Sequence, residues 1–205
     1  MTDYLPITLK AVRGNWLLYS QRKRNPNFIK LSNEILTRDD YTCRYCGFKC
    51  DKFQEVINAD YNFNNNTPKN LMTACSFCAQ CILLDGIGQD EHLGGLVIYL
   101  PEISQSELNH FCRVLFCSML KDAPYRGKLQ ATYLSLQDRG LEVTNLFGPN
   151  TSDAAVFGQS LIDSQLSLEQ QNHPIMQHLR ILPAKKYFKE QIEYWRNTVF
   201  AKIPL

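Results

Sequence analysis

Two Cys-x-x-Cys pairs limit what this chain can fold into more than any other feature of its sequence. Cys43 and Cys46 form the first pair, Cys75 and Cys78 form the second, and 28 residues lie between them. A Cys-x-x-Cys turn lets two thiolates converge on one ion, and two such turns complete the tetrahedral shell that zinc prefers in structural sites. We therefore predict that these four residues bind one Zn²⁺. An iron centre of rubredoxin type uses the same ligands and stays an open alternative.

Spacing separates the remaining four cysteines into two kinds. Cys50 and Cys81 lie four and three residues beyond a pair, so either is a possible substitute ligand. If the segment around the second pair is helical, Cys78 and Cys81 share a face, which makes Cys81 the better substitute. Cys112 and Cys117 lie five residues apart in a helical pattern, and their side chains would diverge by about 140°. We expect these two to be small buried hydrophobic residues.

The composition is that of a packed protein with little net charge. The chain has 205 residues, of which 44% are hydrophobic and 20% are charged, and its formal net charge is +2. These values argue against a disordered chain, and the near balance of charge argues against a dedicated nucleic-acid binder. One local basic cluster consists of Arg22, Lys23, Arg24 and Lys30. We interpret it as a solvated loop, with a site for phosphate or an acidic partner as the alternative.

Targeting and membrane signals are missing from the pattern. The N-terminal segment has no basic stretch followed by an apolar core, and no apolar run approaches the ~20 residues that span a bilayer. We expect the protein to stay in a reducing cytosol. Paired cysteines there are more often metal ligands or redox groups than disulfides, which favours a metal site.

Hydrophobic periodicity and turn residues predict an α+β fold. In the first half they indicate strands at 7–12, 53–63 and 93–102, a basic loop containing Pro26, a short helix that starts at Ser32 or Asn33 and runs into the first cysteine pair, and a helix that ends the segment 71–84. The second half is expected to be predominantly helical. We predict a zinc-binding module over residues 1–100 and a helical region over 101–205, packed together as one compact unit.

The first helix of the second half starts with a capping-box pattern. Ser104 and Glu107 have the required spacing, and the helical pattern continues to residue 122. Its predicted apolar face consists of Leu108, Phe111, Leu115 and Met119.

Three further helices are expected. One covers 125–140 and stops at Gly140, and the next covers 151–165 and starts at Thr151 or Ser152. The last covers 184–200 and is strongly amphipathic. Its apolar stripe, which we interpret as core with a partner-facing role as the alternative, consists of Phe188, Ile192, Trp195 and Val199.

The order of these features resembles the zinc-bearing HNH endonucleases. A Cys-x-x-Cys, a short strand, a loop and then Asn70-Leu71 ahead of a second Cys-x-x-Cys follow one another over residues 37–85. The resemblance implies a ββα core held by the structural metal. It also implies a general base on the first strand, an Asn that orients it, and a His or Asn after the second pair that helps to hold a catalytic ion.

Most catalytic positions of that family are occupied by other residues here. Asn70 stands where the family has its Asn, but the first strand offers only Asn58, Asp60 and Asn62, and Ala79 follows the second pair. No histidine occurs before residue 92. A general base needs a pKa near the operating pH, which imidazole has and an amide lacks. We predict an HNH-like core without the reaction, keep a divergent metal-dependent nuclease as the alternative, and interpret Asn70 as a turn or helix-cap residue.

The chain as a whole resembles the IcmJ (DotN) family of the Dot/Icm type IVB secretion machinery. The four paired cysteines and the segment 94–127 carry this resemblance, which extends over the full length. It implies a non-catalytic cytosolic subunit of the coupling-protein complex, held at the inner membrane through its partners. It further implies binding to the C-terminal extension of the coupling ATPase, beside other adaptor subunits, in support of effector export. Exposed apolar residues of the helical half are the expected contacts, and no nucleic-acid partner is expected.

Overall fold

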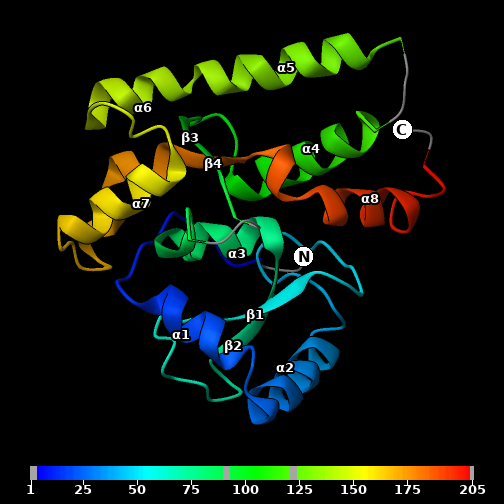
Figure 1. The fold of residues 1–205 in the computed structure, drawn as a ribbon, viewed down its shortest axis with the longest axis vertical. Coiled ribbons are helices and arrows are strands. Elements are labelled where there is room, and N and C mark those ends of the chain that lie inside the picture. The colour runs from blue at the N-terminus through cyan, green and yellow to red at the C-terminus, as the bar shows by residue number, and fades with distance from the viewer. Residues whose placement is uncertain (1–3, 90–92, 121–123, 204–205) are drawn as a thin grey trace.

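The computed structural model describes residues 4–89, 93–120 and 124–203, and it is a mixed α+β structure (Figure 1). The predicted class is therefore confirmed. Its helices and strands are α1 (Asn15–Arg22), α2 (Pro26–Arg38), β1 (Gln54–Asn58), β2 (Leu71–Cys75), α3 (Ser76–Ile82), β3 (Gly95–Tyr99), α4 (Gln105–Ser118), α5 (Arg126–Asp138), α6 (Gly140–Phe147), α7 (Ala154–Asp163), β4 (Leu179–Pro183) and α8 (Lys189–Asn197). Short 3-10 turns are η1 (Leu84–Gly86), η2 (Gln170–Asn172), η3 (Pro174–His178) and η4 (Lys185–Tyr187).

The elements are stacked along the long axis of the molecule. α1, α2, β1 and β2 form one end, α3 lies in the middle, and α5 and α6 run across the other end (Figure 1). One continuous core of buried residues extends from Leu9 through the paired cysteines to Trp195 in α8. β3 pairs with β4, so residues from before and after position 100 share one sheet. The division into 1–100 and 101–205 stays a prediction.

A hairpin leads directly into the central helix. β1 pairs with β2 in antiparallel register, with Gln54 opposite Cys75 and Asn58 opposite Leu71. Cys75 ends β2 and is also the residue that caps α3, so the chain changes from strand to helix without a loop. The segment predicted to end as a helix therefore begins as a strand. This junction brings the second cysteine pair to the middle of the molecule.

A second small sheet was only half predicted. The strand expected at 93–102 is β3, but its partner β4 was not expected, because its five residues contain Arg180 and end at Pro183. Every residue of β4 is buried. Arg180 tolerates burial because its guanidinium donates to the carbonyl oxygens of Ile103, Gln177 and Leu179. An arginine and a proline within five residues are typical of a loop, so the sequence pattern did not indicate a buried strand here.

Three predictions for the N-terminal third were wrong. Residues 7–12 form no strand; this extended segment is held by main-chain bonds such as Lys10 N–H to the Cys81 carbonyl at 2.9 Å. The expected basic loop is mostly helical, since it contains the end of α1 and the start of α2. α2 begins at Pro26 rather than near residue 32, and the Asn25 side chain accepts from the Asn27 and Phe28 amides. Proline at the first helical position is compatible with that start.

The capping box at the start of α4 is confirmed. The Ser104 side chain accepts from the Glu107 amide, and the Glu107 carboxylate accepts from the Ser104 amide. The predicted apolar face holds for Leu108 and Leu115, but Phe111 is 42% exposed. The helix ends at Ser118, and the last two residues of the predicted range 104–122 lie outside the described residues.

The remaining helices follow the predicted pattern with shifted ends. α5 stops just before Gly140, but α6 starts there, which the sequence pattern did not indicate. α7 is capped by Asp153, whose carboxylate accepts from the amides of Ala155 and Val156, rather than by Thr151 or Ser152. In the C-terminal stripe, Phe188, Ile192 and Trp195 are buried, which confirms them as core, whereas Val199 is 38% exposed.

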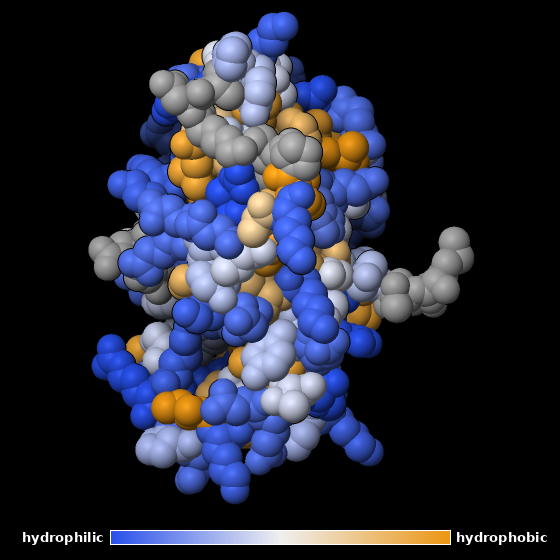
Figure 2. All heavy atoms as spheres, turned by 90° about the vertical axis from the view of Figure 1, so that its right-hand side faces the viewer, coloured by the Kyte–Doolittle hydropathy of each residue, from blue (hydrophilic) through white to orange (hydrophobic). Residues whose placement is uncertain are grey.

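The face on the side of α8 is mainly hydrophilic among the residues that the structure describes (Figure 2). Figure 2 shows that hydrophilic side chains cover most of this face, with separate apolar patches, most of them in the upper half. In the part of the chain that the structure describes, we find no helix with the length and apolar character needed to cross a membrane.

Candidate metal centre

Four buried thiols meet between the hairpin and α3. Cys43 and Cys46 lie in the turn between α2 and β1, Cys75 ends β2, and Cys78 lies in the first turn of α3. Their sulfur atoms all lie within 4.8 Å of one another, and the Cys46 and Cys75 sulfurs are 3.7 Å apart. The structure thus brings together the four residues that spacing selected. We call them the cysteine cluster.

A tight turn holds the first pair. The Gly47 amide donates to the Cys43 carbonyl at 2.8 Å, and the Cys43 amide donates to the Phe48 carbonyl at 3.0 Å. Gly47 has a φ of 71°, a left-handed conformation that glycine adopts without steric cost. A Cβ atom at this position would also lie 2.2 Å from the Tyr4 hydroxyl. Glycine therefore avoids backbone strain in the turn that holds the two thiols.

Close packing of the four thiols separates their pKa values. Hydrogen bonds with the other three thiols lower the pKa of Cys46 far below the usual cysteine range. Burial raises the pKa of Cys43, but hydrogen bonds from Cys75 and Cys78 outweigh burial and lower it. Burial and the neighbouring Cys43 and Cys46 raise the pKa values of Cys75 and Cys78 well above the usual range. A bound cation would replace the protons that remain, because metal ligation deprotonates thiols.

Helix α4 carries three buried polar side chains, two of which contact the cluster. They are Gln105, Asn109 and Arg113, spaced one turn apart, and we call them the α4 polar stripe. The Asn109 amide group donates to the Cys78 sulfur at 3.2 Å, and the Arg113 guanidinium donates to the Cys75 sulfur at 3.2 Å.

Gln105, the first residue of the stripe, bonds to β4 of the second sheet. Gln105 donates from its amide group to the Asn109 side-chain oxygen and to the Ile181 carbonyl, both at 2.9 Å, and accepts from the Ile181 amide. Hydrogen bonds therefore connect β4, α4 and a cluster sulfur in one chain. Polar residues at helical spacing are normally predicted to face the solvent. The sequence pattern therefore did not indicate that this stripe is buried.

Arg113 is enclosed by aromatic rings. Its guanidinium carbon lies 3.6 Å from the centre of the Phe48 ring, 5.1 Å from that of Trp195 and 5.4 Å from that of Phe77. The side chain is fully buried. Burial lowers the pKa of Arg113, but attraction to the cluster sulfurs outweighs burial and raises it. The cation thus stays charged in an apolar enclosure beside the thiols.

The other four cysteines lie outside the cluster. The Cys81 thiol donates to the Phe77 carbonyl at 3.3 Å along α3, and the Cys50 thiol lies 4.0 Å from the Asp51 carboxylate. Burial raises the pKa of Cys112 to about 12 and that of Cys117 to about 11. These two are buried, protonated thiols in the core, as predicted.

The cluster fits a tetrahedral metal site. Four sulfurs approach one another closely enough to share one ion, and hydrogen-bond donors already point at two of them. Thiolate ligands favour zinc or iron over hard cations such as Mg²⁺. The cluster could therefore hold a metal ion, and its sulfur ligands alone do not distinguish zinc from iron.

The positions expected for nuclease catalysis are occupied by a structural network. Asn58 is fully buried; its amide group donates to the carbonyl oxygens of Asn62 and Asn65, and its side-chain oxygen accepts from Arg22. Asn70 donates to the Asp60 carboxylate at 2.8 Å. Asn70 is thus a turn residue, as interpreted.

The electrostatics of Asp60 do not suit a general base. Asp60 is exposed, and its slight burial raises the pKa of the carboxyl group, but hydrogen bonds from Asn65, Asn62 and Asn70 outweigh this and lower it. Ala79, at the position after the second pair, is buried and has no ligand atom. His92 lies outside the described residues.

The basic cluster of the sequence is not a uniform loop. Arg22 is buried and donates to the side-chain oxygens of Asn58 and Asn66 and to the Val56 carbonyl. Its guanidinium also stacks over Phe28. The interpretation as a solvated loop is therefore wrong for Arg22, which ties α1 to the hairpin.

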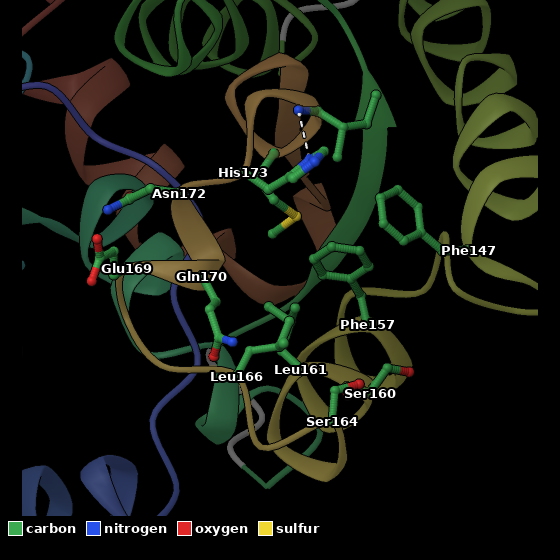
Figure 3. A pocket seen from close by; sticks show the side chains of 12 residues that line it. Phe147, Phe157, Ser160, Leu161, Ser164, Leu166, Glu169, Gln170, Asn172 and His173 are labelled. Carbon is green, nitrogen blue, oxygen red and sulfur yellow. Dashed lines mark hydrogen bonds between the residues drawn. The ribbon is translucent and has the colours of Figure 1, made fainter.

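A cavity of about 700 Å³ opens in the helical half, away from the cysteine cluster. It lies between α6, α7 and the segment 164–176 (Figure 3). Phe147 and Phe157 reach into it from two helices, with ring centres 5.5 Å apart. Leu161, Leu166 and Met176 extend the apolar wall, and Glu169 and His173 also line it. Its volume lies within the range of ligand-binding pockets in proteins.

Comparison with known proteins shows a relative that matches nearly the whole chain. The chain is 41% identical over 197 residues to the type 4 apparatus protein DotN of Legionella pneumophila subsp. pneumophila strain Philadelphia 1. The match covers 96% of this chain and 92% of that protein. No family model matches the chain.

Proposed function

The chain belongs to the family of the type 4 apparatus protein DotN, and we propose that it is a non-catalytic, zinc-binding adaptor subunit of a type IVB secretion coupling complex. It binds the C-terminal extension of the coupling ATPase beside other subunits, supports effector export, and is held through these partners at the cytoplasmic face of the inner membrane. The observation that carries the proposal is the full-length match to DotN, a protein named for its secretion apparatus.

Zinc is the proposed occupant of the cysteine cluster. Four buried thiols within 4.8 Å of one another support a tetrahedral site, and a reducing compartment favours metal over disulfides. Zinc would serve as an inert tether between the first turn and the β2–α3 junction. Metal analysis of the purified protein tests this, and visible absorption would indicate iron instead.

The proposed core is HNH-like without the HNH reaction. Support comes from the order β1, β2, α3 and from the two cysteine pairs that flank the hairpin. This unit is a scaffold that keeps the structural metal and has lost the catalytic residues.

A pull-down tests the adaptor function. The purified protein and the C-terminal extension of the coupling ATPase are mixed at micromolar concentrations and separated by size. We expect a stoichiometric complex to elute. Separate elution of the two would contradict the proposal.

The cavity of the helical half is the proposed contact site for that extension. Replacing Phe147 or Leu166, each 38% exposed, by glutamate puts a charge into the apolar wall. We expect the affinity for the extension to fall at least about ten-fold, as for an interface anchor, measured by calorimetry. Leu141→Glu is the control, because Leu141 is 67% exposed on α6 and does not line the cavity. Equal affinities for the Phe147 and Leu141 variants would exclude this site.

A divergent nuclease is the second candidate, and one observation favours it. Asp60 and Asn70 form an exposed hydrogen-bonded pair next to the hairpin, where the HNH family has catalytic groups. We expect no cleavage of plasmid DNA with Mg²⁺ or Mn²⁺, since no imidazole lies among these residues. Cleavage that disappears in Asp60→Ala and Asn70→Ala would reverse the order of the two candidates.

A further inference from the structure

The charge of the proposed metal centre requires a counter-charge inside the protein. Four thiolates around a divalent cation carry a net charge of −2, and all four cysteines of the cluster are buried. Burying an uncompensated charge is strongly unfavourable even after relaxation. A buried tetrathiolate site is therefore favourable only if nearby donors or cations offset this charge.

Arg113 is the cation in the right position. Its guanidinium donates to the Cys75 sulfur at 3.2 Å. His110, on the same helix, also bonds to the Cys46 thiol, but Arg113 is the fully buried cation of the two. No ion pair with a carboxylate involves Arg113 in the described ranges. A fully buried arginine without a carboxylate is costly unless another anion is present. The thiolates of the cysteine cluster supply the negative charge next to Arg113.

The neighbours of Arg113 restrict the orientation of its guanidinium group. Phe48 stacks against its guanidinium, and its second terminal nitrogen lies 3.3 Å from Nδ1 of His110. If that ring nitrogen accepts, the other ring nitrogen carries the hydrogen and donates to the Cys46 carbonyl at 2.6 Å. One guanidinium therefore contacts a cluster sulfur and, through His110, the main chain of the first cysteine pair.

We propose that the α4 polar stripe is the outer coordination sphere of the metal centre, with Arg113 as its counter-charge and Asn109 as a second donor that orients Cys78. This inference rests on the proposed metal binding and goes beyond it, because it assigns metal affinity to residues of the helical half. Arg113 also packs against Trp195, so the stripe connects the metal to α8 as well as to α4. Both residues are positioning residues, since neither is a proposed ligand.

Chelator competition measures the effect on zinc affinity. We expect Arg113→Met, which keeps the volume and removes the charge, to weaken zinc binding about 10- to 100-fold, as for other outer-sphere changes. The matched control is Arg22→Met, because Arg22 is also buried and stacked on aromatic rings but bonds to Asn58 and Asn66 instead of sulfur. This control should bind zinc like the wild type.

Cobalt substitution supplies a readout that a general loss of stability would not change. A hydrogen bond to a thiolate stabilises its lone pairs, so its removal should shift the sulfur-to-cobalt absorption to longer wavelength in Arg113→Met and in Asn109→Leu. The Arg22→Met spectrum should not shift. If Arg113→Met is insoluble, Asn109→Leu decides, and an unshifted spectrum for it would overturn the proposal.

The outcomes separate this inference from the proposed function. A wild-type protein that binds neither zinc nor cobalt would remove the metal centre and the inference together. A wild-type protein with one zinc, combined with wild-type affinity and an unshifted spectrum in Arg113→Met, would overturn the counter-charge alone.

Discussion

Replacing Cys43 or Cys75 by serine is expected to abolish stoichiometric zinc binding and to leave most of the protein insoluble. Each residue contributes one of four sulfurs that lie within 4.8 Å of one another, so the change breaks the shared site. Structural zinc supplies about 10–16 kcal/mol of apparent free energy in peptide systems. That amount matches or exceeds the ~5–15 kcal/mol net stability of most domains. Zinc content and soluble yield are the measurements.

Cys112→Ala is the control for this prediction. Cys112 is equally buried, but it lies in α4 outside the cluster, and its raised pKa keeps it a neutral thiol. Its replacement removes one sulfur from the core and should cost no more than a small truncation, about 1 kcal/mol, with full zinc content. Equal damage from Cys43→Ser and Cys112→Ala would show that the cysteines had been sorted wrongly.

Trp195→Ala is expected to lower the free energy of unfolding by about 3–5 kcal/mol, as for large aromatic truncations in cores. The indole is fully buried, and its ring centre lies 5.4 Å from that of Phe48 and 5.2 Å from that of Phe77. These two rings belong to the two cysteine turns, so the change removes the contact between α8 and the proposed metal centre. Urea unfolding of the zinc-loaded protein measures the loss.

Val199→Ala is the matched control in the same predicted stripe. The sequence pattern treats Val199 and Trp195 alike, but Val199 lies beyond the end of α8 and is 38% exposed. Its truncation should cost about 0.5 kcal/mol or less. Similar losses for the two variants would mean that the C-terminal stripe packs differently from the structure.

Elements with a strong local pattern could be predicted, and elements that depend on distant partners could not. The capping box at Ser104, β3 and the core residues of α8 have their cause within a few positions of sequence. β4 has not, because the burial of Arg180 depends in part on the carbonyl oxygen of Ile103, which lies 77 positions away. The basic cluster was misjudged for the same reason, since Arg22 finds its acceptors 34 to 44 residues further on.

The candidate metal site also has one part that the sequence predicted and one part that it did not. The spacing of Cys43, Cys46, Cys75 and Cys78 predicted that these four residues converge, because a Cys-x-x-Cys turn presents both thiols on one side, but it left Cys50 and Cys81 open as substitutes. Only the tertiary structure decided what faces these sulfurs. Asn109 and Arg113 are 31 and 38 residues from their sulfur partners, and a helical pattern cannot assign buried polar side chains to an anion that forms elsewhere in the chain. Residue spacing determines the local geometry of each cysteine turn. The groups that compensate the buried charge are determined by the packing of segments that are distant in the sequence.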